Sequence, residues 1–205
     1  KLSKKIDKIL IATGPKKKNL NLVNYLKNEQ IDFFCGSEEN VLKRYLNAAE
    51  YVGANTIVRI TGDCPLIDYE LIDKIITRYK SSNLEYISNI DPPTYPDGQD
   101  IEIFSYKTLK KISTLVKKKY DKEHVTPLMR KSIKIKKKNI LNNKDYSNLR
   151  WTLDTNSDLL TIKNVLEYFH PSITFSWLDI LKLNKKKPEL FKSNKHIIRN
   201  QGIKC

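Results

Sequence analysis

Short apolar runs alternate with longer amphipathic segments along the first 90 residues, and this alternation is what most limits the possible fold. The strand-like runs are rich in Ile, Val and Phe, and they lie at 8–13, 31–36, 56–61 and 85–89. Helical patterns lie between them at 21–30, 37–54 and 68–80. Strands that alternate with helices of about 10–15 residues predict βαβ units. We therefore expect an α/β fold, a three-layer sandwich around a mixed, mostly parallel sheet.

The helical patterns also predict ends and buried faces. In 68–80, apolar side chains recur at helical spacing, so the pattern predicts an inward face of Leu71, Ile72, Ile75 and Ile76. In 37–54, Ser37 is the expected N-cap and Gly53 the expected end of the helix.

The pattern is less regular after Asn89. Residues 90–100 hold three prolines and one glycine, which predict a loop. Further strands are expected at 101–105, which is a candidate antiparallel strand, and at 133–141 and 149–155. Further helices are expected at 106–118, at 122–132 with a break near Pro127, at 156–169 behind an Asn or Ser cap, and in two short pieces after Pro171. We find no repeat and no long linker, so we expect one domain over 1–205 that contains an excursion at 91–140.

Composition excludes several classes of protein. No run approaches the roughly 20 apolar residues that cross a bilayer, and the start of the chain has no apolar signal region. The three cysteines, Cys35, Cys64 and Cys205, lie far apart and predict neither a disulfide framework nor a zinc site. We expect a reduced, cytoplasmic protein with no membrane partner.

The formal charge of +15 has two interpretations. The lysines fall in short runs with little aromatic interleaving, and Lys, Asn and Ile are all favoured by AT-rich codons, so compositional drift explains the charge without a function. A functional patch for an anionic ligand is the alternative. Because no motif of a known nucleic-acid-binding module is present, we do not expect nucleic acid as a partner.

Two aspartates follow predicted strands. In "IVRITGDCPLID" (57–68) the strand runs into Asp63, where Gly62 permits a tight turn and Pro65 fixes its exit. Asp154 ends the run "WTLD" in the same way. Ligands of open α/β sheets bind beyond the carboxyl ends of the strands, and Mg²⁺ prefers one or two carboxylates plus substrate phosphates. The alternative is that each Asp only caps the following turn.

The segment "IVRITGDCPLID" and six further segments resemble motifs of the cytidylyltransferases that make CMP-activated sugars. The six segments occur in the same order here as in that family. The spore-coat polysaccharide branch is the most similar, and the acylneuraminate and Kdo cytidylyltransferases are more distant. The resemblance covers nearly the whole chain, and Lys122 stands where the family has an arginine. The segments are "IDKILIAT", "GSEENVLKRYLNAA", "YPDGQDIEIFSYKTL", "DKEHVTPLM", "LRWTLDTNSDL" and "NKHIIRNQG".

The resemblance implies a Rossmann-like, GT-A-like nucleotide-diphospho-sugar transferase fold and a Mg²⁺-dependent reaction. An oxygen of a sugar acid or phosphorylated acceptor attacks the α-phosphorus of CTP, and pyrophosphate leaves. The expected partners are CTP and a small anionic sugar-like acceptor, and the expected pathway is surface polysaccharide or glycan synthesis. The resemblance also implies a homodimer formed through the excursion, with Ile101 or Phe104 covered by the partner unless both face the core.

The resemblance assigns roles to individual residues. Asp63 and Asp154 match the catalytic, metal-coordinating aspartates. The nucleotide-binding positions are Thr13, Ser37, Glu38, Arg44 and Thr61. The acceptor-binding positions are Asp97, Gln99, Asp100, Glu102 and His124.

Several of these residues have a simpler interpretation. Glu102 on an alternating strand could face water, His124 could be structural, and Arg44 could be a surface charge. Cys64 is expected to be a packing residue, since no His stands near it in the sequence. If Arg59 in the third strand is buried, it needs a carboxylate partner.

The chain departs from the family at its start. Family members open with a strand and the loop "A-R-x-x-S-x-R-L-P-x-K", which wraps the triphosphate, whereas "KLSKKIDKIL" resembles only the family's segment beyond that loop. Either the chain is part of a longer protein, which we favour, or it is a degenerate relative. We expect an unpaired site in the sheet beside Ile9, Ile11, Ile57 and Ile60, and little turnover by these 205 residues alone. A non-catalytic sugar-nucleotide-binding protein and a basic nucleic-acid-binding protein are the alternative functions.

Overall fold

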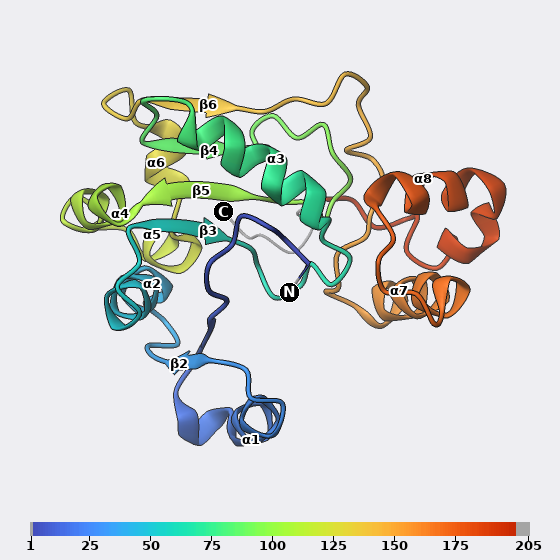
Figure 1. Ribbon diagram of the computed structural model, residues 1–205, viewed down its shortest axis with the longest axis horizontal. Helices are drawn as coiled ribbons and strands as arrows, with labels where there is room; N and C mark the ends of the chain where they lie inside the picture. The colour runs from blue at the N-terminus through green and yellow to red at the C-terminus, as the bar shows by residue number, and fades with distance from the viewer. Residues whose placement is uncertain (1, 200–205) are drawn as a thin grey trace.

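The computed structural model describes residues 2–199, which form an α/β fold around a mixed sheet (Figure 1). Four strands make the main sheet in the order β3 (Thr56–Arg59), β5 (Glu102–Ser105), β4 (Tyr86–Ser88) and β6 (Lys137–Asn139). β5 is antiparallel to β3 and β4, and β4 is parallel to β6. Three of the four strands therefore share one direction. The predicted mixed sheet and the antiparallel strand at 101–105 are confirmed.

A second, smaller sheet stands beside the first. It consists of β1 (Ile11–Thr13) and β2 (Phe33–Cys35), which are parallel. Within residues 2–199 neither strand pairs with β3, and Figure 1 shows β2 and α1 (Leu20–Asn28) set apart from the main sheet. Ile9 is 49% exposed and Ile11 36%. Over the described residues the sheet is thus unpaired between β1 and β3 as expected; Ile9 and Ile11 are exposed there, whereas Ile57 and Ile60 pack against the cores of the main sheet.

The two faces of the main sheet pack against different helices, because side chains alternate along each strand. Tyr86 and Phe104 lie in a core formed with α2 (Val41–Tyr51), α4 (Tyr106–Ser113) and α6 (Pro127–Lys131). Ile87 and Ile103 lie in a core with α3 (Tyr69–Lys80). All four residues predicted to face inward on α3 are buried there. The helices on both faces confirm the three-layer arrangement.

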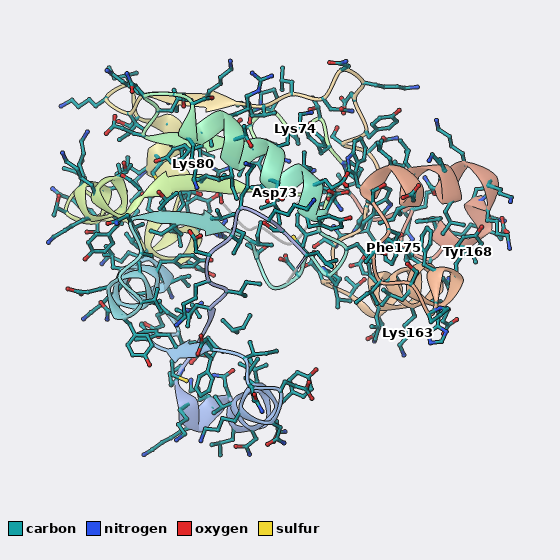
Figure 2. All side chains as sticks on the ribbon, viewed as in Figure 1. Asp73, Lys74, Lys80, Lys163, Tyr168 and Phe175 are labelled. Atoms are coloured by element: carbon teal, nitrogen blue, oxygen red, sulfur yellow. The ribbon has the colours of Figure 1, made fainter. Side chains whose placement is uncertain are left out.

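A third apolar cluster occupies one end of the molecule. It joins α7 (Asn156–Phe169), α8 (Trp177–Lys186) and the short helix η2 (Pro188–Phe191). Phe175 stacks on Phe169 with ring centroids 4.3 Å apart, and Figure 2 shows Phe175 and Tyr168 at this end. The N-cap of α7 is Thr155, in a capping box with Asp158, rather than the expected Asn or Ser.

Two other sequence predictions need correction. The N-cap of α2 is Asn40, whose side chain accepts from the N–H of Lys43 at 2.9 Å, while Ser37 lies in the turn before it. The run 149–155 forms no strand and contributes only an isolated bridge between Arg150 and Asp97. The predicted break near Pro127 is present, because α5 (Lys119–His124) ends before α6 begins.

The start of the described chain is tied to α3. Asp73 accepts hydrogen bonds from the Ser3 hydroxyl at 2.5 Å and from the N–H groups of Lys4 and Lys5, and Figure 2 shows where it lies on α3. Among residues 2–199, no helix combines the length and the apolar character needed to cross a membrane.

Candidate active site

Asp63 and Asp154 come to the same edge of the fold through a backbone contact. The turn after β3 closes with the N–H of Cys64 bonded to the carbonyl of Thr61 at 3.3 Å. The carbonyl of Asp63 then accepts from the N–H of Leu153 at 2.8 Å and from the hydroxyl of Thr152 at 3.0 Å. Because Asp154 directly follows Leu153, the two aspartates assigned to the metal lie close together.

The loop at 90–100 is held against the same segment. The N–H of Asp97 donates to the carbonyl of Leu149 at 2.8 Å, and the N–H of Trp151 donates to the carbonyl of Asp97 at 2.7 Å. Gly98 follows with a φ of 100°, and a Cβ there would lie 2.7 Å from the carbonyl carbon and oxygen of Trp151. Only glycine fits this close approach.

Arg150 connects three of the carboxylates. Its Nε donates to Asp158 at 2.9 Å, its Nη1 to Asp97 at 3.1 Å and its Nη2 to Asp154 at 2.7 Å. Burial favours the neutral form of Asp158, but hydrogen bonds from Arg150 and Asn194 hold the pKa of Asp158 well below its usual value. The hydrogen bond with Asp158 in turn raises the pKa of Arg150. Arg150 therefore fixes the positions of Asp97 and Asp154.

A second arginine, Arg199, contacts two aspartates of this group, Asp97 and Asp100. Nη2 of Arg199 lies 2.6 and 2.7 Å from the two carboxylate oxygens of Asp100, and its Nε lies 3.7 Å from Asp97. The sequence patterns singled out neither Arg199 nor Arg150, although both lie in family-like motifs, "NKHIIRNQG" and "LRWTLDTNSDL". The sequence could still have indicated that such arginines are needed, because several aspartates that come together in a fold require cationic partners.

The cluster is electronegative although the chain is basic. Five aspartates face two arginines, Arg150 and Arg199, so the formal charge is −3. Burial raises the pKa of Asp97 to about 6, and the neighbouring Asp100 and Asp154 add to this against the opposing effect of Arg199. Burial likewise raises the pKa of Asp100. The five carboxylates belong to Asp63, Asp97, Asp100, Asp154 and Asp158.

Two carboxylates of this cluster are the least engaged by other groups of the described chain. That of Asp154 is 51% exposed and contacts Arg150 through one oxygen, and that of Asp63 has a long contact of 3.7 Å with the Cys64 thiol. Over residues 2–199 no group of three or more His, Cys, Asp or Glu side chains could hold a metal. Two carboxylates still fit Mg²⁺, which completes its shell with water and substrate phosphates. Burial raises the pKa of Cys64 to about 12, as befits a packing residue.

The residues assigned to the nucleotide fall into two places. Thr61 lies beside Asp63, with its hydroxyl 3.3 Å from the Cys64 sulfur. The other four gather where β1 and β2 end: the carbonyl of Thr13 accepts from Gly36 N–H at 3.0 Å, and that of Ser37 accepts from Arg44 at 2.6 Å. Glu38 pairs with Lys18 at 2.5 Å across the same end.

Two residues assigned to the acceptor, Glu102 and Gln99, are buried and have partners inside the protein. Glu102 is 2% exposed, pairs with Arg59 and accepts from the Tyr86 hydroxyl at 2.5 Å. It does not face water, and the partner expected for a buried Arg59 is confirmed. Gln99 is fully buried, donates to the carbonyl of Leu66 at 2.6 Å and accepts from the N–H of Asp68 at 3.0 Å.

His124 ends α5, where its ring lies 4.3 Å from that of Tyr120. Glu102, Gln99 and His124 therefore have structural partners, whereas Asp97 and Asp100 lie in the cluster.

Comparison with known proteins places this geometry in a family. A family model described as Cytidylyltransferase matches residues 1–195. The chain is 32% identical over 200 residues to the uncharacterized protein MJ1063 of Methanocaldococcus jannaschii, over 96% of this chain and 81% of that protein. It is 26% identical over 186 residues to the spore coat polysaccharide biosynthesis protein SpsF of Bacillus subtilis, over 89% and 77% of the two chains.

Solved structures agree. A cytidylyltransferase from Leptospira borgpetersenii serovar Hardjo-bovis is similar with a TM-score of 0.88 at 31% identity, over 93% of this chain and 81% of that one. A CMP:2-keto-3-deoxy-manno-octonic acid synthetase complexed with CTP is similar with a TM-score of 0.58 at 12% identity, over 82% and 83% of the chains. The second likeness shows the fold alone, and together these findings confirm the resemblance seen in the sequence.

Proposed function

The chain belongs to the cytidylyltransferase family, and we propose that it transfers CMP from CTP to an acidic sugar or phosphorylated acceptor for surface glycan synthesis. The observation that carries the proposal is the meeting of Asp63 and Asp154 at one edge of an electronegative cluster. The name of SpsF, a spore coat polysaccharide biosynthesis protein, supports the polysaccharide pathway, and the Cytidylyltransferase family supports CTP as the donor.

Magnesium is part of the proposal. A cluster with a formal charge of −3 repels a triphosphate, so CTP needs a cation between its phosphates and the aspartates. Asp63 and Asp154 would hold this ion, because their carboxylates are the least engaged in the cluster. When bound, Mg²⁺ would neutralise negative charge on the phosphates.

The remaining residues position the reactants. Arg150 holds Asp154 toward the cation and Asp97 toward the acceptor, and it is a positioning residue because its N–H groups are taken by carboxylates. Asp97 and Asp100 would accept hydrogen bonds from acceptor hydroxyls, since carboxylate oxygens accept several at once. Among residues 2–199, the Oδ1 atom of Asp97 has only a long contact with Arg199, which leaves it room to do so.

We also propose a homodimer in the cytoplasm. Ile101 and Phe104 cannot form its contact, because both are fully buried in the core of their own chain. Exposed apolar side chains of α7 and α8 support a contact there instead; they include Leu159, Leu160, Leu166 and Leu178. The cytoplasm supplies CTP, and the described cysteines, Cys35 and Cys64, are unpaired as a reducing compartment requires.

The test is pyrophosphate release by the full-length protein with CTP, Mg²⁺ and a panel of sugar acids and sugar phosphates. Asp63→Asn and Asp154→Asn each remove one charge at constant shape, and each should lower kcat by about 100-fold or more. Asp32→Asn, which alters an exposed pair with Lys8, is the control and should leave turnover unchanged. CTP or sugar-nucleotide binding without any turnover would instead identify a non-catalytic relative.

A further inference from the structure

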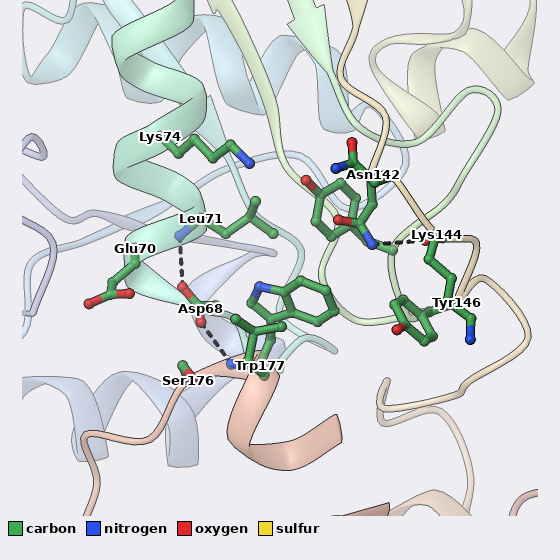
Figure 3. Close-up of a pocket in the computed structure, with 12 residues that line it drawn as sticks. Asp68, Glu70, Leu71, Lys74, Asn142, Lys144, Tyr146, Ser176 and Trp177 are labelled. Carbon is green, nitrogen blue, oxygen red and sulfur yellow. Dashed lines mark hydrogen bonds between the residues drawn. The ribbon is translucent and has the colours of Figure 1, made fainter. Parts of the chain in front are cut away.

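A cavity of about 460 Å³ lies between the start of α3, the segment 142–146 and the start of α8 (Figure 3). None of the five aspartates of the acidic cluster lines it. It sits where the apolar core below α3 meets the cluster around α7 and α8, because Trp177 packs into both. It is therefore a second hollow, separate from the candidate active site.

Aromatic side chains form the walls of this cavity. The ring of Trp177 lies 5.4 Å from that of Tyr95 and 6.0 Å from that of Tyr146, with interplanar angles of 66° in both cases. The rings thus meet edge to face and form a bent apolar surface, with no slot between parallel rings. Such a surface suits a puckered ring better than a flat nucleobase.

The walls are held in place before any ligand arrives. Asp68, 2% exposed, accepts from the N–H of Leu71 and from the N–H of Trp177, both at 2.7 Å. It thereby joins the first turns of α3 and α8, as the dashed lines in Figure 3 show. On the other side, Asn142 donates its side-chain N–H to the carbonyl of Lys144 at 2.8 Å. A preformed site loses little conformational freedom on binding.

Tyr95 provides an unused polar group. Its side chain lines the cavity, it is 2% exposed, and within residues 2–199 its hydroxyl has no hydrogen-bond partner. A buried hydroxyl without a partner is unfavourable, and proteins rarely keep one without a reason. Burial also raises the pKa of Tyr95, so the hydroxyl stays protonated and can both donate and accept.

The rim of the cavity is cationic. Lys74 and Lys144 both line it, and over residues 2–199 neither forms an ion pair. Nζ of Lys144 lies 5.6 Å from the ring centre of Tyr146. Figure 3 shows Lys74 reaching over the cavity toward Asn142, while Glu70 points away. Since the carboxylate of Asp68 is already occupied by two N–H groups, the accessible charge at this site is positive.

We propose that this cavity binds an acidic sugar, a pyranose ring that carries a carboxylate. Such a ligand has an apolar C–H face, which Trp177 and Tyr146 would cover, and hydroxyls, which the Tyr95 hydroxyl would bond. Its carboxylate would pair with Lys74, whereas Figure 3 shows Lys144 extending past Tyr146 on the other side of the cavity. This second saccharide site does not depend on the transfer reaction, because its residues differ from those of the acidic cluster.

Trp177 allows the proposal to be tested by fluorescence. The chain has two tryptophans, and Trp151→Phe leaves Trp177 as the only one. We expect methyl β-D-glucuronide to change its emission with saturation, methyl β-D-glucoside to bind at least about fivefold more weakly, and inorganic phosphate to bind more weakly still. Calorimetry on the unmodified protein should rank the three probes in the same order. An absence of glucuronide binding, or phosphate binding as tight as that of the glucuronide, overturns the proposal.

Point variants locate the binding. Tyr95→Phe removes only the unpartnered hydroxyl, so Tm should stay the same or rise while glucuronide affinity falls about fivefold. Lys74→Gln should weaken the glucuronide but not the glucoside, and Lys80→Gln, an exposed lysine on the same helix, is its control. Asp63→Asn should bind the glucuronide normally. Unchanged affinity in Tyr95→Phe, or lost affinity in Asp63→Asn, would contradict the assignment to this cavity, and the latter would move the binding to the acidic cluster.

Discussion

Arg59 on β3 and Glu102 on β5 face each other across an antiparallel pair and form an ion pair inside the sheet. Their side chains are 16% and 2% exposed. Burial alone would lower the pKa of Arg59, but the charge of Glu102 raises it above its usual value. The arginine therefore stays charged in the interior, and its stability there depends on one carboxylate.

Removing that carboxylate should be costly. We expect Glu102→Gln to lower the free energy of unfolding by about 3–5 kcal/mol, because it leaves a buried guanidinium without its counter-charge. The double variant Arg59→Met/Glu102→Leu should recover most of this loss, since it removes both charges. Urea unfolding of the single and double variants measures the effect. If the free energy of unfolding of Glu102→Gln lies within about 1 kcal/mol of the parent value, and its KM for the acceptor is higher, Glu102 would instead be a residue of the acceptor site.

Gly98 gives a second prediction. Its φ of 100° disfavours any other residue, and a Cβ would meet the backbone of Trp151 at 2.7 Å. We expect Gly98→Ala to lower the free energy of unfolding by about 2 kcal/mol or more and to reduce turnover, because the strain would pull Asp97 away from Arg150. Gly62→Ala is the matched control beside Asp63, since a Cβ there meets nothing within 4 Å. Equal effects of the two substitutions would argue against a special role for Gly98.

Sequence patterns predicted the layers of this fold well where a single periodicity decides the structure. The inward face of α3 is an example, because helical spacing of Leu71, Ile72, Ile75 and Ile76 leaves only one way to bury them. The run 149–155 shows the limit of this reasoning. It reads as a strand, but its backbone groups bond to Asp63 and Asp97, two loop residues distant in sequence, so no ladder forms.

In the candidate site too, local sequence patterns predicted some features, while others depend on how distant segments fold together. The place of Asp63 just beyond a strand could be predicted, because it ends an apolar run next to turn residues, whereas the run before Asp154 forms no strand. Arg150 could not be assigned to Asp97, Asp154 and Asp158 without the fold, since its partners are set by how the loop at 90–100 folds back. The alternative that Glu102 faces water was wrong for a related reason. Alternation along β5 does not reveal that both faces of this sheet are covered.

Asp97 should make stability depend on pH. Its pKa is about 6 in the folded protein against an ordinary value of 3.8, so between these values the folded state binds the proton more tightly than the unfolded state. The contribution of Asp97 to the free energy of unfolding therefore falls as pH rises from 4 to 6, by about 2–3 kcal/mol. Burial is the largest cause of this raised pKa; Asp100 and Asp154 add to it, and Arg199 and Arg150 oppose it.

The measurement is the difference in free energy of unfolding between the parent protein and Asp97→Asn. Asparagine cannot titrate, so subtracting the two curves removes the contribution of groups that behave alike in both proteins. The parent should lose stability relative to the variant as pH rises from 4 to 6, and the difference should level off above pH 7. A difference that is constant over this range would show that Asp97 titrates at its ordinary pKa.

Arg150 provides the last prediction, because its planar fork is needed as well as its charge. Three separate nitrogens reach Asp158, Asp97 and Asp154, and the side chain is 7% exposed. Lysine has the same charge but a single nitrogen, so Arg150→Lys can serve only some of these carboxylates. We expect the free energy of unfolding to fall by about 2–4 kcal/mol.

Turnover should fall further than the folded fraction explains, because Asp97 and Asp154 would no longer be fixed. The control is Arg78→Lys, which changes an exposed arginine on α3. It should change the free energy of unfolding by no more than about 0.5 kcal/mol and leave turnover unchanged. Pyrophosphate release at a temperature where both variants are folded separates the two effects. Full turnover by folded Arg150→Lys would mean that this arginine only stabilises the cluster and does not position the groups that act on CTP and its acceptor.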